Sequence, residues 1–253
     1  MDRAQWIGSF LVACLLVGGG VAVAQTPDPP PPPPASVSAE LETCERSPLP
    51  ARRVAAFVGA MPAVAGAERM QMRFDLQRRR LAERRWRTMR GAEGFGTWET
   101  SEPDRAGFVF HKRVDGLQVP ASYRAVVRFR WTAADGTTVR RARRSTASCA
   151  QPDLRPDLVA VSLRAVLDVS VVPAVYRLVV RNDGRSDAGP FAVRVAGALA
   201  EVAGLAAGEK TSVTVVGAPC AAGATVRASV DADFRVDESD ERNGLRRRCP
   251  LAR

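Results

Sequence analysis

The sequence is poor in the side chains on which most metal and hydrolytic chemistry depends. Its 253 residues include one histidine, His111, and five cysteines, none of which stands in a Cys-x-x-Cys pair. Zinc sites and nucleophile–base pairs need several such groups close together. His111 lies in the run Phe108–Lys112, which is typical of a strand and has no serine motif beside it. We therefore expect a strand-surface histidine, no metal site and no histidine-based catalysis.

Motifs for nucleotide binding are missing as well. The sequence has no P-loop, and no G-x-G-x-x-G motif follows a predicted strand. Catalysis by carboxylates alone, as in glycosidases, has no positive signal. The sequence thus predicts a protein that is not an enzyme and that carries no cofactor.

The first 24 residues are typical of a secretory signal peptide. Arg3 precedes an apolar run from Trp6 to Val23, which ends in a small-x-small site before Gln25. A retained anchor is the alternative, because roughly 18 apolar residues can span a bilayer, but three consecutive glycines and the cleavage-like end disfavour it. Leu11–Cys14 also fits the lipobox of bacterial lipoproteins, although the apolar run continues past Cys14. We expect a secreted protein with no transmembrane span after cleavage, and lipidation of Cys14 as the minority alternative.

Proline divides the rest of the chain. Residues 25–38 contain Pro27 and Pro29–Pro34, which should form a polyproline II spacer of roughly 25 Å. Pro152 and Pro156 interrupt the later pattern of strands. We therefore predict a basic domain at residues 39–152 and a second domain at residues 153–253.

Both predicted domains show the period of two that half-buried strands have. Apolar and polar residues alternate in short runs: Met70–Leu76, Tyr123–Trp131, Tyr176–Arg181, Phe191–Val195 and Val226–Val230. Turn residues separate these runs, and Asp135-Gly136 predicts a hairpin turn into residues 137–147. The pattern predicts an all-β fold of two tandem immunoglobulin-like antiparallel β-sandwiches.

Two local features refine this expectation. Tyr123 follows Leu117 by six residues at a predicted strand start, which resembles the tyrosine corner of immunoglobulin-like sandwiches. Residues 77–90 could form a short basic helix, because Leu81, Trp86 and Met89 would share roughly one face. We favour two strand ends and a turn there.

Four cysteines remain after signal cleavage, and an even number in an exported chain indicates two disulfides with three possible connectivities. Cys220 precedes the penultimate predicted strand and Cys249 ends the last one. Those places are neighbours in an antiparallel hairpin. We therefore predict a Cys220–Cys249 bond, and a Cys44–Cys149 bond that brackets the first domain.

Positive charge is concentrated in the first domain. Residues 37–150 hold 22 basic and 12 acidic side chains, whereas residues 151–253 hold 14 and 13. Alternation places Arg124, Arg128 and Arg130 on one sheet face, and we expect Arg140 on the next strand to lie alongside them. Arginine forks pair well with phosphate and carboxylate. These four residues are the candidate site for an anionic polymer, with a solvated arginine-rich face as the alternative.

Six carboxylates fall within eleven residues near the C-terminus: Asp231, Asp233, Asp237, Glu238, Asp240 and Glu241. They could supply oxygen ligands to calcium. Their spacing is not that of an EF-hand loop, and Asp and Asn are common in turns because of their local hydrogen bonds. We therefore expect a turn and no metal.

Four segments of the second half together resemble CARDB, the cell adhesion related domain found in bacteria: 156–163 (PDLVAVSL), 181–195 (RNDGRSDAGPFAVRV), 205–215 (LAAGEKTSVTV) and 236–244 (VDESDERNG). The resemblance covers about 95 residues and implies a seven-stranded immunoglobulin-like sandwich with an adhesion or scaffold role. The chain departs from the family pattern in having Gly244 where a second Asn is usual, and in adding Cys220 and Cys249.

These observations together predict an exported, non-catalytic binding or scaffold protein of the bacterial cell surface or extracellular space. Its partner would be a protein or an anionic cell-surface polymer, bound through the first domain in the polymer case. An accessory or inhibitory subunit of a secreted enzyme is the alternative.

Overall fold

The computed structural model describes residues 32–165, 173–242 and 244–249. The predicted signal peptide, its cleavage site, the lipobox and residues 25–31 of the proline-rich stretch lie outside these residues. Within the described ranges, no helix is both long and apolar enough to cross a membrane.

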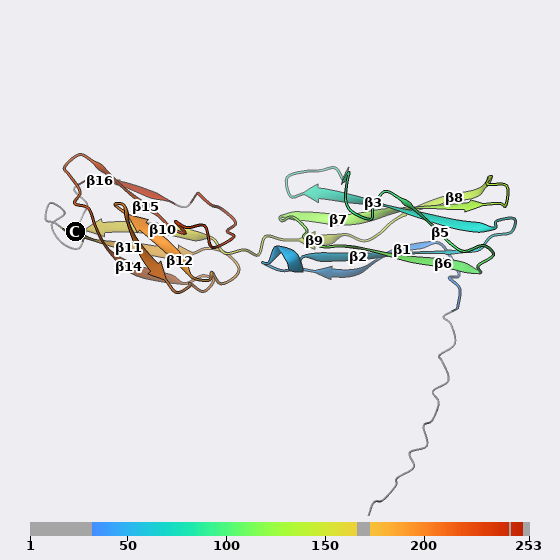
Figure 1. The fold of residues 1–253 in the computed structure, drawn as a ribbon, viewed down its shortest axis with the longest axis horizontal. Coiled ribbons are helices and arrows are strands. Elements are labelled where there is room, and N and C mark those ends of the chain that lie inside the picture. The colour runs from blue at the N-terminus through green and yellow to red at the C-terminus, as the bar shows by residue number, and fades with distance from the viewer. Residues whose placement is uncertain (1–31, 166–172, 243, 250–253) are drawn as a thin grey trace, which may run out of the picture. The chain divides into compact units, whose positions relative to one another are not determined.

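The N-terminal half of the described chain forms a sandwich of two antiparallel sheets, seen face to face in Figure 1. One sheet has the strand order β1-β2-β6, and the other has the order β4-β3-β7-β8, with β5 pairing β3 and β9 pairing β7. The elements are β1 (Ser38–Glu45), the 3-10 helix η1 (Pro50–Arg52), β2 (Val54–Pro62), β3 (Arg69–Arg80), β4 (Arg87–Thr88), β5 (Trp98–Thr100), β6 (Gly107–Val114), β7 (Ala121–Thr132), β8 (Thr138–Ser145) and β9 (Cys149–Gln151).

The core of this N-terminal sandwich lies between its two sheets and follows directly from the alternation. Every second residue of β7, from Tyr123 to Trp131, is almost fully buried, and so is every second residue of β3 from Met70 to Leu76. Gly59 on β2 lies against them, and a Cβ there would be 2.9 Å from the Met72 sulfur. The glycine therefore lets the two sheets approach closely at that point.

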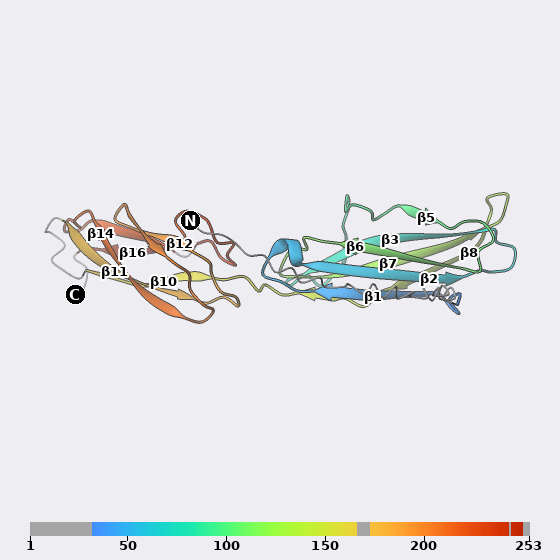
Figure 2. The ribbon, with the colours of Figure 1, turned by 60° about the horizontal axis from the view of Figure 1, so that its bottom comes forward.

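The segment after β3 protects the open edge of its sheet. The chain turns after Arg80 and runs back beside β3, first as β4 and then as β5. Figure 2 shows β5 beside β3 at this edge. Between the two short strands, the backbone amides of Met89 and Gly96 donate hydrogen bonds to the Leu76 and Phe74 carbonyls of β3. The prediction of strand ends and a turn for residues 77–90 is thereby confirmed, and an edge that could pair with another chain is covered.

The predicted tyrosine corner is also present. Tyr123 stands near the start of β7 and is 1% exposed, and its hydroxyl donates a 2.9 Å hydrogen bond to the Gln118 carbonyl. Burial raises the pKa of this phenol, because the charged form would lose its hydration.

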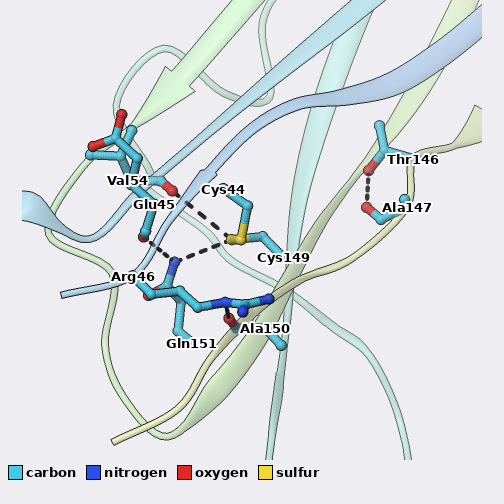
Figure 3. The surroundings of a disulfide bond; sticks show 9 residues. All are labelled: Cys44, Glu45, Arg46, Val54, Thr146, Ala147, Cys149, Ala150 and Gln151. Carbon is cyan, nitrogen blue, oxygen red and sulfur yellow. Dashed lines mark hydrogen bonds between the residues drawn. A yellow bond between two sulfur atoms is a disulfide. The ribbon is translucent and has the colours of Figure 1, made fainter. Parts of the chain in front are cut away.

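Both predicted disulfides are formed. Cys44 on β1 bonds Cys149 on β9 with Cα atoms 5.4 Å apart, and Cys220 bonds Cys249 with Cα atoms 6.0 Å apart. Figure 3 shows how polar contacts reinforce the first bond. The Gln151 side-chain amide donates a 2.8 Å hydrogen bond to the Glu45 carbonyl, and Arg46 donates a 3.0 Å bond to the Ala150 carbonyl. The last strand of the N-terminal sandwich, β9, is therefore joined to its first strand, β1, and the residue after it by a disulfide and two hydrogen bonds.

The C-terminal half forms a second sandwich of seven strands in two antiparallel sheets. Its strands are β10 (Leu158–Ala165), β11 (Ala174–Asn182), β12 (Phe191–Val195), β13 (Ala198–Val202), β14 (Lys210–Gly217), β15 (Thr225–Ser229) and β16 (Leu245–Arg248). The sheet orders are β10-β11-β14 and β13-β12-β15-β16.

The two sandwiches share one strand order. Without the short extra strands β5 and β9, the first sandwich also has seven strands. In both sandwiches the first, second and fifth strands form one sheet, and the other four strands form the second sheet. This antiparallel arrangement is that of immunoglobulin-like sandwiches, so the predicted fold class is confirmed. By this correspondence, β7 and β8 hold the same places in the first sandwich as β15 and β16 in the second.

Candidate functional site

A concentration of positive charge lies on the outer face of the six-stranded sheet of the N-terminal sandwich. Inward-pointing β7 residues such as Ala125, Val127 and Phe129 are buried. Alternation therefore places Arg124, Arg128 and Arg130 together on the opposite face, as predicted. Between the first two lies Val126, which is only 1% exposed although it points outward. The neighbouring side chains thus cover the sheet at this point.

Strand β3 supplies a polar partner for each arginine of the row. Arg124 donates to the Gln77 side-chain carbonyl at 3.0 Å, and Arg130 donates to that of Gln71 at 2.6 Å. In both cases the register places the two residues directly opposite each other. These amides orient the guanidinium groups and leave their positive charge uncompensated.

Asp75 is the one acidic residue that pairs with this row within the described part of the chain. It is 5% exposed, and its carboxylate accepts a 2.8 Å bond from Arg73 and a 2.7 Å bond from Arg128. A buried carboxylate needs such pairing because an isolated charge is costly to desolvate. One negative charge here is shared between two arginines.

Two tryptophans flank the row. The Arg124 guanidinium lies 4.4 Å from the ring centroid of Trp86, and the Arg130 guanidinium lies 4.3 Å from that of Trp98. Such cation–π contacts hold the planar group in place. Burial lowers the pKa of Arg124, and the nearby positive charges of Arg143 and Arg79 lower it further.

Strand β8 adds two arginines that the sequence analysis did not select. Arg143 lies directly opposite Arg128, and Arg141 lies directly opposite Arg130. Residues paired in this way project from the same face. The five residues Arg124, Arg128, Arg130, Arg141 and Arg143 are called the arginine face below.

A groove of about 500 Å³ lies within the arginine face, lined by Trp98, Arg128, Arg130, Arg141 and Arg143 together with backbone of β7 and β8. Among the described residues, neither Arg141 nor Arg143 has an ion-pair partner. The groove therefore combines the ring of Trp98 with several guanidinium groups and a single nearby carboxylate, that of Asp75.

Arg140 is not part of this face, and its predicted place alongside the row was wrong. The hairpin after β7 sets a register in which Arg140 lies opposite Trp131. Trp131 points into the core, so Arg140 projects from the other face, where its guanidinium lies 5.3 Å from the Trp131 ring centroid. Because β8 carries arginine at four positions, its own sequence did not indicate which parity faces outward.

His111 lies on β6, as the sequence predicts. Its side chain is 57% exposed, and its Nδ1 atom lies 3.1 Å from a carboxylate oxygen of Glu42 on β1. An exposed pair of this kind matches the expected strand-surface histidine.

Three of the six clustered carboxylates come together in the C-terminal sandwich. Oxygen atoms of Asp231, Glu238 and Glu241 lie within 4.8 Å of one another, with the first two residues buried. Asp231 accepts backbone hydrogen bonds from Arg235 and Val236 at 3.1 and 3.0 Å, and Glu238 accepts one from Leu158. The two Asp231 bonds are local turn contacts of the kind that the sequence predicts, whereas the Glu238 bond joins the turn to the start of β10.

The segments that resemble CARDB meet at one buried asparagine, which the sequence analysis did not single out. Asn182 is 0% exposed and uses both ends of its amide. Its oxygen accepts from the Asp157 and Gly184 backbones at 3.1 and 3.0 Å, and its nitrogen donates to the Ser186 and Leu205 carbonyls at 2.9 and 3.0 Å. One side chain thus joins three of the four segments.

Gly184 and the acidic turn complete this network. A Cβ on Gly184 would lie 2.5 Å from backbone atoms of Arg155, Pro156 and Asp157, so only glycine permits the approach. The fourth segment joins through a 2.9 Å hydrogen bond from the Ser239 backbone to the Pro156 carbonyl. The family-like residues therefore fasten the turns of the C-terminal sandwich together.

The chain overlaps only loosely with solved structures. Red sea bream transglutaminase aligns at 12% identity over 78% of this chain and 28% of its own, with a TM-score of 0.27. The class 5 fimbriae chaperone CfaA aligns at 11% identity over 85% of this chain and all of its own, with a TM-score of 0.27. The CsuC–CsuE chaperone–tip adhesion subunit complex of Acinetobacter baumannii gives 9% identity, 84% and 98% coverage, and a TM-score of 0.29.

A search of curated proteins returns no match. The family models give a clearer result for one part of the chain. Residues 152–247, which contain the whole network around Asn182, match the model of CARDB, a cell-adhesion-related domain, and this match confirms the resemblance predicted for the C-terminal sandwich.

Proposed function

We propose that this chain is an exported, non-catalytic binding or scaffold protein of the bacterial surface or extracellular space, and that its arginine face binds an anionic polymer. The observation that carries the proposal is the pair of arginine–arginine contacts across β7 and β8, around a groove with a tryptophan wall. The match of residues 152–247 to an adhesion-related domain supports a role in surface binding.

Like charges placed directly opposite each other on neighbouring strands destabilise a sheet. Arg128 with Arg143 and Arg130 with Arg141 are two such contacts in succession, and Asp75 offsets only part of their charge. An anion in the groove would relieve this repulsion. The loss of this arginine–arginine repulsion would then make the free energy of binding more favourable.

The chemistry of the groove favours a repeating oxyanion such as a sulfate, carboxylate or phosphate group on a polymer. A guanidinium group donates two parallel hydrogen bonds to an oxyanion. In the groove, the Gln71 amide and the Trp98 ring already hold Arg130 in position, and beside the groove Gln77 and Trp86 hold Arg124 in the same way. Little side-chain entropy would be lost on binding, because these groups are pre-organised.

The absence of catalysis is part of the proposal. Asp75 is buried, and Arg73 and Arg128 each occupy one of its carboxylate oxygens, so it has no free position for proton transfer to a substrate. His111 contacts only one exposed carboxylate in the described structure. We expect no release of reducing ends or phosphate when the mature chain is incubated with acidic polysaccharides or phosphate polymers, and measurable turnover would contradict this.

Binding is tested on the full mature chain with dextran sulfate, polygalacturonate, polyphosphate and neutral dextran. We expect binding to one or more of the three anionic polymers and none to neutral dextran. The variant Arg130→Ser/Arg141→Ser removes one facing pair from the groove and should weaken binding about tenfold, which corresponds to ~1.4 kcal/mol.

Arg164→Ser/Arg177→Ser is the matched control, because these residues also face each other across two strands but lie on β10 and β11. It removes the same charge from the chain. Equal losses in the two variants would mean that only net charge matters, and the proposal would then fail. Export is tested separately by N-terminal sequencing of secreted protein, which should begin at Gln25.

A further inference from the structure

The C-terminal sandwich has a net charge near zero, yet its arginines are not evenly spread. On the four-stranded sheet, Val193, Val195, Val226 and Ala228 are buried and point inward. The residues between them must therefore point outward. Those positions carry Arg194 on β12, Arg227 on β15 and, opposite the latter, Arg246 on β16.

These three arginines are close together in the sheet. Arg227 and Arg246 are direct cross-strand partners, and Arg194 pairs with Ser229, two residues along β15 from Arg227. All three side chains are exposed. Within the described residues none of the three has an ion-pair partner, whereas Asp233 and Glu201 both pair with Arg235.

A groove of about 720 Å³ lies at these residues. Besides the three arginines, its lining includes Arg242 and the small residues of two turns, among them Gly197 and Pro219. The β14–β15 turn is fixed by the Cys220–Cys249 disulfide and by a 2.8 Å backbone bond from Cys249 to Ala224. The wall of the groove is therefore anchored to the last strand and needs no reordering when a ligand binds.

We propose that the C-terminal sandwich carries a second oxyanion-binding site, formed by Arg194, Arg227 and Arg246, that takes one phosphate, sulfate or carboxylate group of an anionic polymer. Three guanidinium groups supply paired donors around a single oxyanion. The site spans β12, β15 and β16, and the last two of these strands correspond to β7 and β8 of the N-terminal sandwich. It does not depend on the arginine face and would exist if that face bound nothing.

A cross-strand arginine pair alone does not define the site. Arg164 and Arg177 face each other in the same way on β10 and β11 and lie outside this groove. What distinguishes Arg227 and Arg246 is a third arginine and a concave surface with fixed walls. Arg164→Ser/Arg177→Ser is therefore the control, because it removes the same number of positive charges outside the groove.

The experiment is calorimetric titration of the full mature chain with inorganic tripolyphosphate at low salt. We expect two sites per chain. Arg227→Ser/Arg246→Ser should remove one site or weaken it at least tenfold and leave the other unchanged. Arg130→Ser/Arg141→Ser should have the reciprocal effect, and Arg164→Ser/Arg177→Ser should keep both sites.

The two proposals can fail separately in this experiment. A single site that only Arg130→Ser/Arg141→Ser removes would overturn the second site and leave the arginine face. A single site that only Arg227→Ser/Arg246→Ser removes would do the opposite. If Arg227→Ser/Arg246→Ser unfolds, the single variant Arg246→Ser replaces it, because Arg246 is exposed on an edge strand. Unchanged binding by Arg246→Ser would then count against the proposal.

Discussion

The two sandwiches share a strand order but are held together by different means. In the N-terminal sandwich, β3 and β7 are twelve residues long and bury large side chains such as Phe74, Phe129 and Trp131. The C-terminal sandwich has shorter strands, buries Tyr176 and Phe191 in a core of its own, and adds the polar network around Asn182. The residues that mark the family there serve the fold, whereas the arginine face of the first sandwich carries no family motif. A family resemblance in such a domain thus indicates how the turns are tied together, and the ligand must be inferred from surface charge and shape.

The disulfides give the largest expected effect in this comparison. Their sequence separations are 105 residues for Cys44–Cys149 and 29 residues for Cys220–Cys249. Loop-entropy arguments give about 4.7 and about 3.5 kcal/mol of stabilisation, as upper estimates. Replacing each pair by alanine should therefore destabilise the N-terminal sandwich more than the C-terminal one.

Fluorescence and circular dichroism separate the two unfolding transitions. Outside residues 1–24, the tryptophans are at residues 86, 98 and 131, all in the N-terminal sandwich. Tryptophan emission follows that sandwich, while circular dichroism follows both. A larger loss from Cys220→Ala/Cys249→Ala than from Cys44→Ala/Cys149→Ala would contradict the entropic account.

Asn182→Ala should give the next largest effect, confined to the C-terminal sandwich. The substitution leaves buried backbone donors and acceptors of three turns without partners, which should cost about 3 kcal/mol. Urea unfolding followed by circular dichroism measures this loss, and tryptophan emission should stay unchanged. Gln77→Ala is the matched control, because its amide bonds Arg124 and Thr88 at a solvent-accessible place and should cost less than about 1 kcal/mol.

Calcium should have the smallest effect. Asp231 and Glu238 already accept backbone hydrogen bonds, so their carboxylates have protein partners in place of a cation. Thermal midpoints in millimolar calcium and in chelator should therefore agree within error. A rise of several degrees in calcium would show binding to the folded state and would make the acidic turn a metal site.

Much of the fold could be predicted because alternation fixes which residues point inward. Tyr123–Trp131 and Tyr176–Arg181 have one buried face each, so strand, face and core followed from the sequence. Asn182 was missed because a polar residue at the end of a strand gives no periodic signal, and its four partners come from three separate segments.

The errors on the surface have an equally specific cause. The parity of β8 depends on its hairpin register, since Arg140, Arg141, Arg143 and Arg144 look alike in sequence. The second arginine cluster was hidden by a net charge near zero, because the acidic residues of that domain gather in turns and the arginines on one sheet face. Net charge over a domain does not report such separation.

The salt dependence of polymer binding tests the central claim most directly. The slope of log Kd against log salt concentration reports how many cation–anion contacts form. For the full mature chain on dextran sulfate, Arg130→Ser/Arg141→Ser should reduce this slope by about two contacts, while Arg164→Ser/Arg177→Ser should leave it unchanged. If the two variants have the same slope, the arginine face is a solvated surface and the account of binding is wrong.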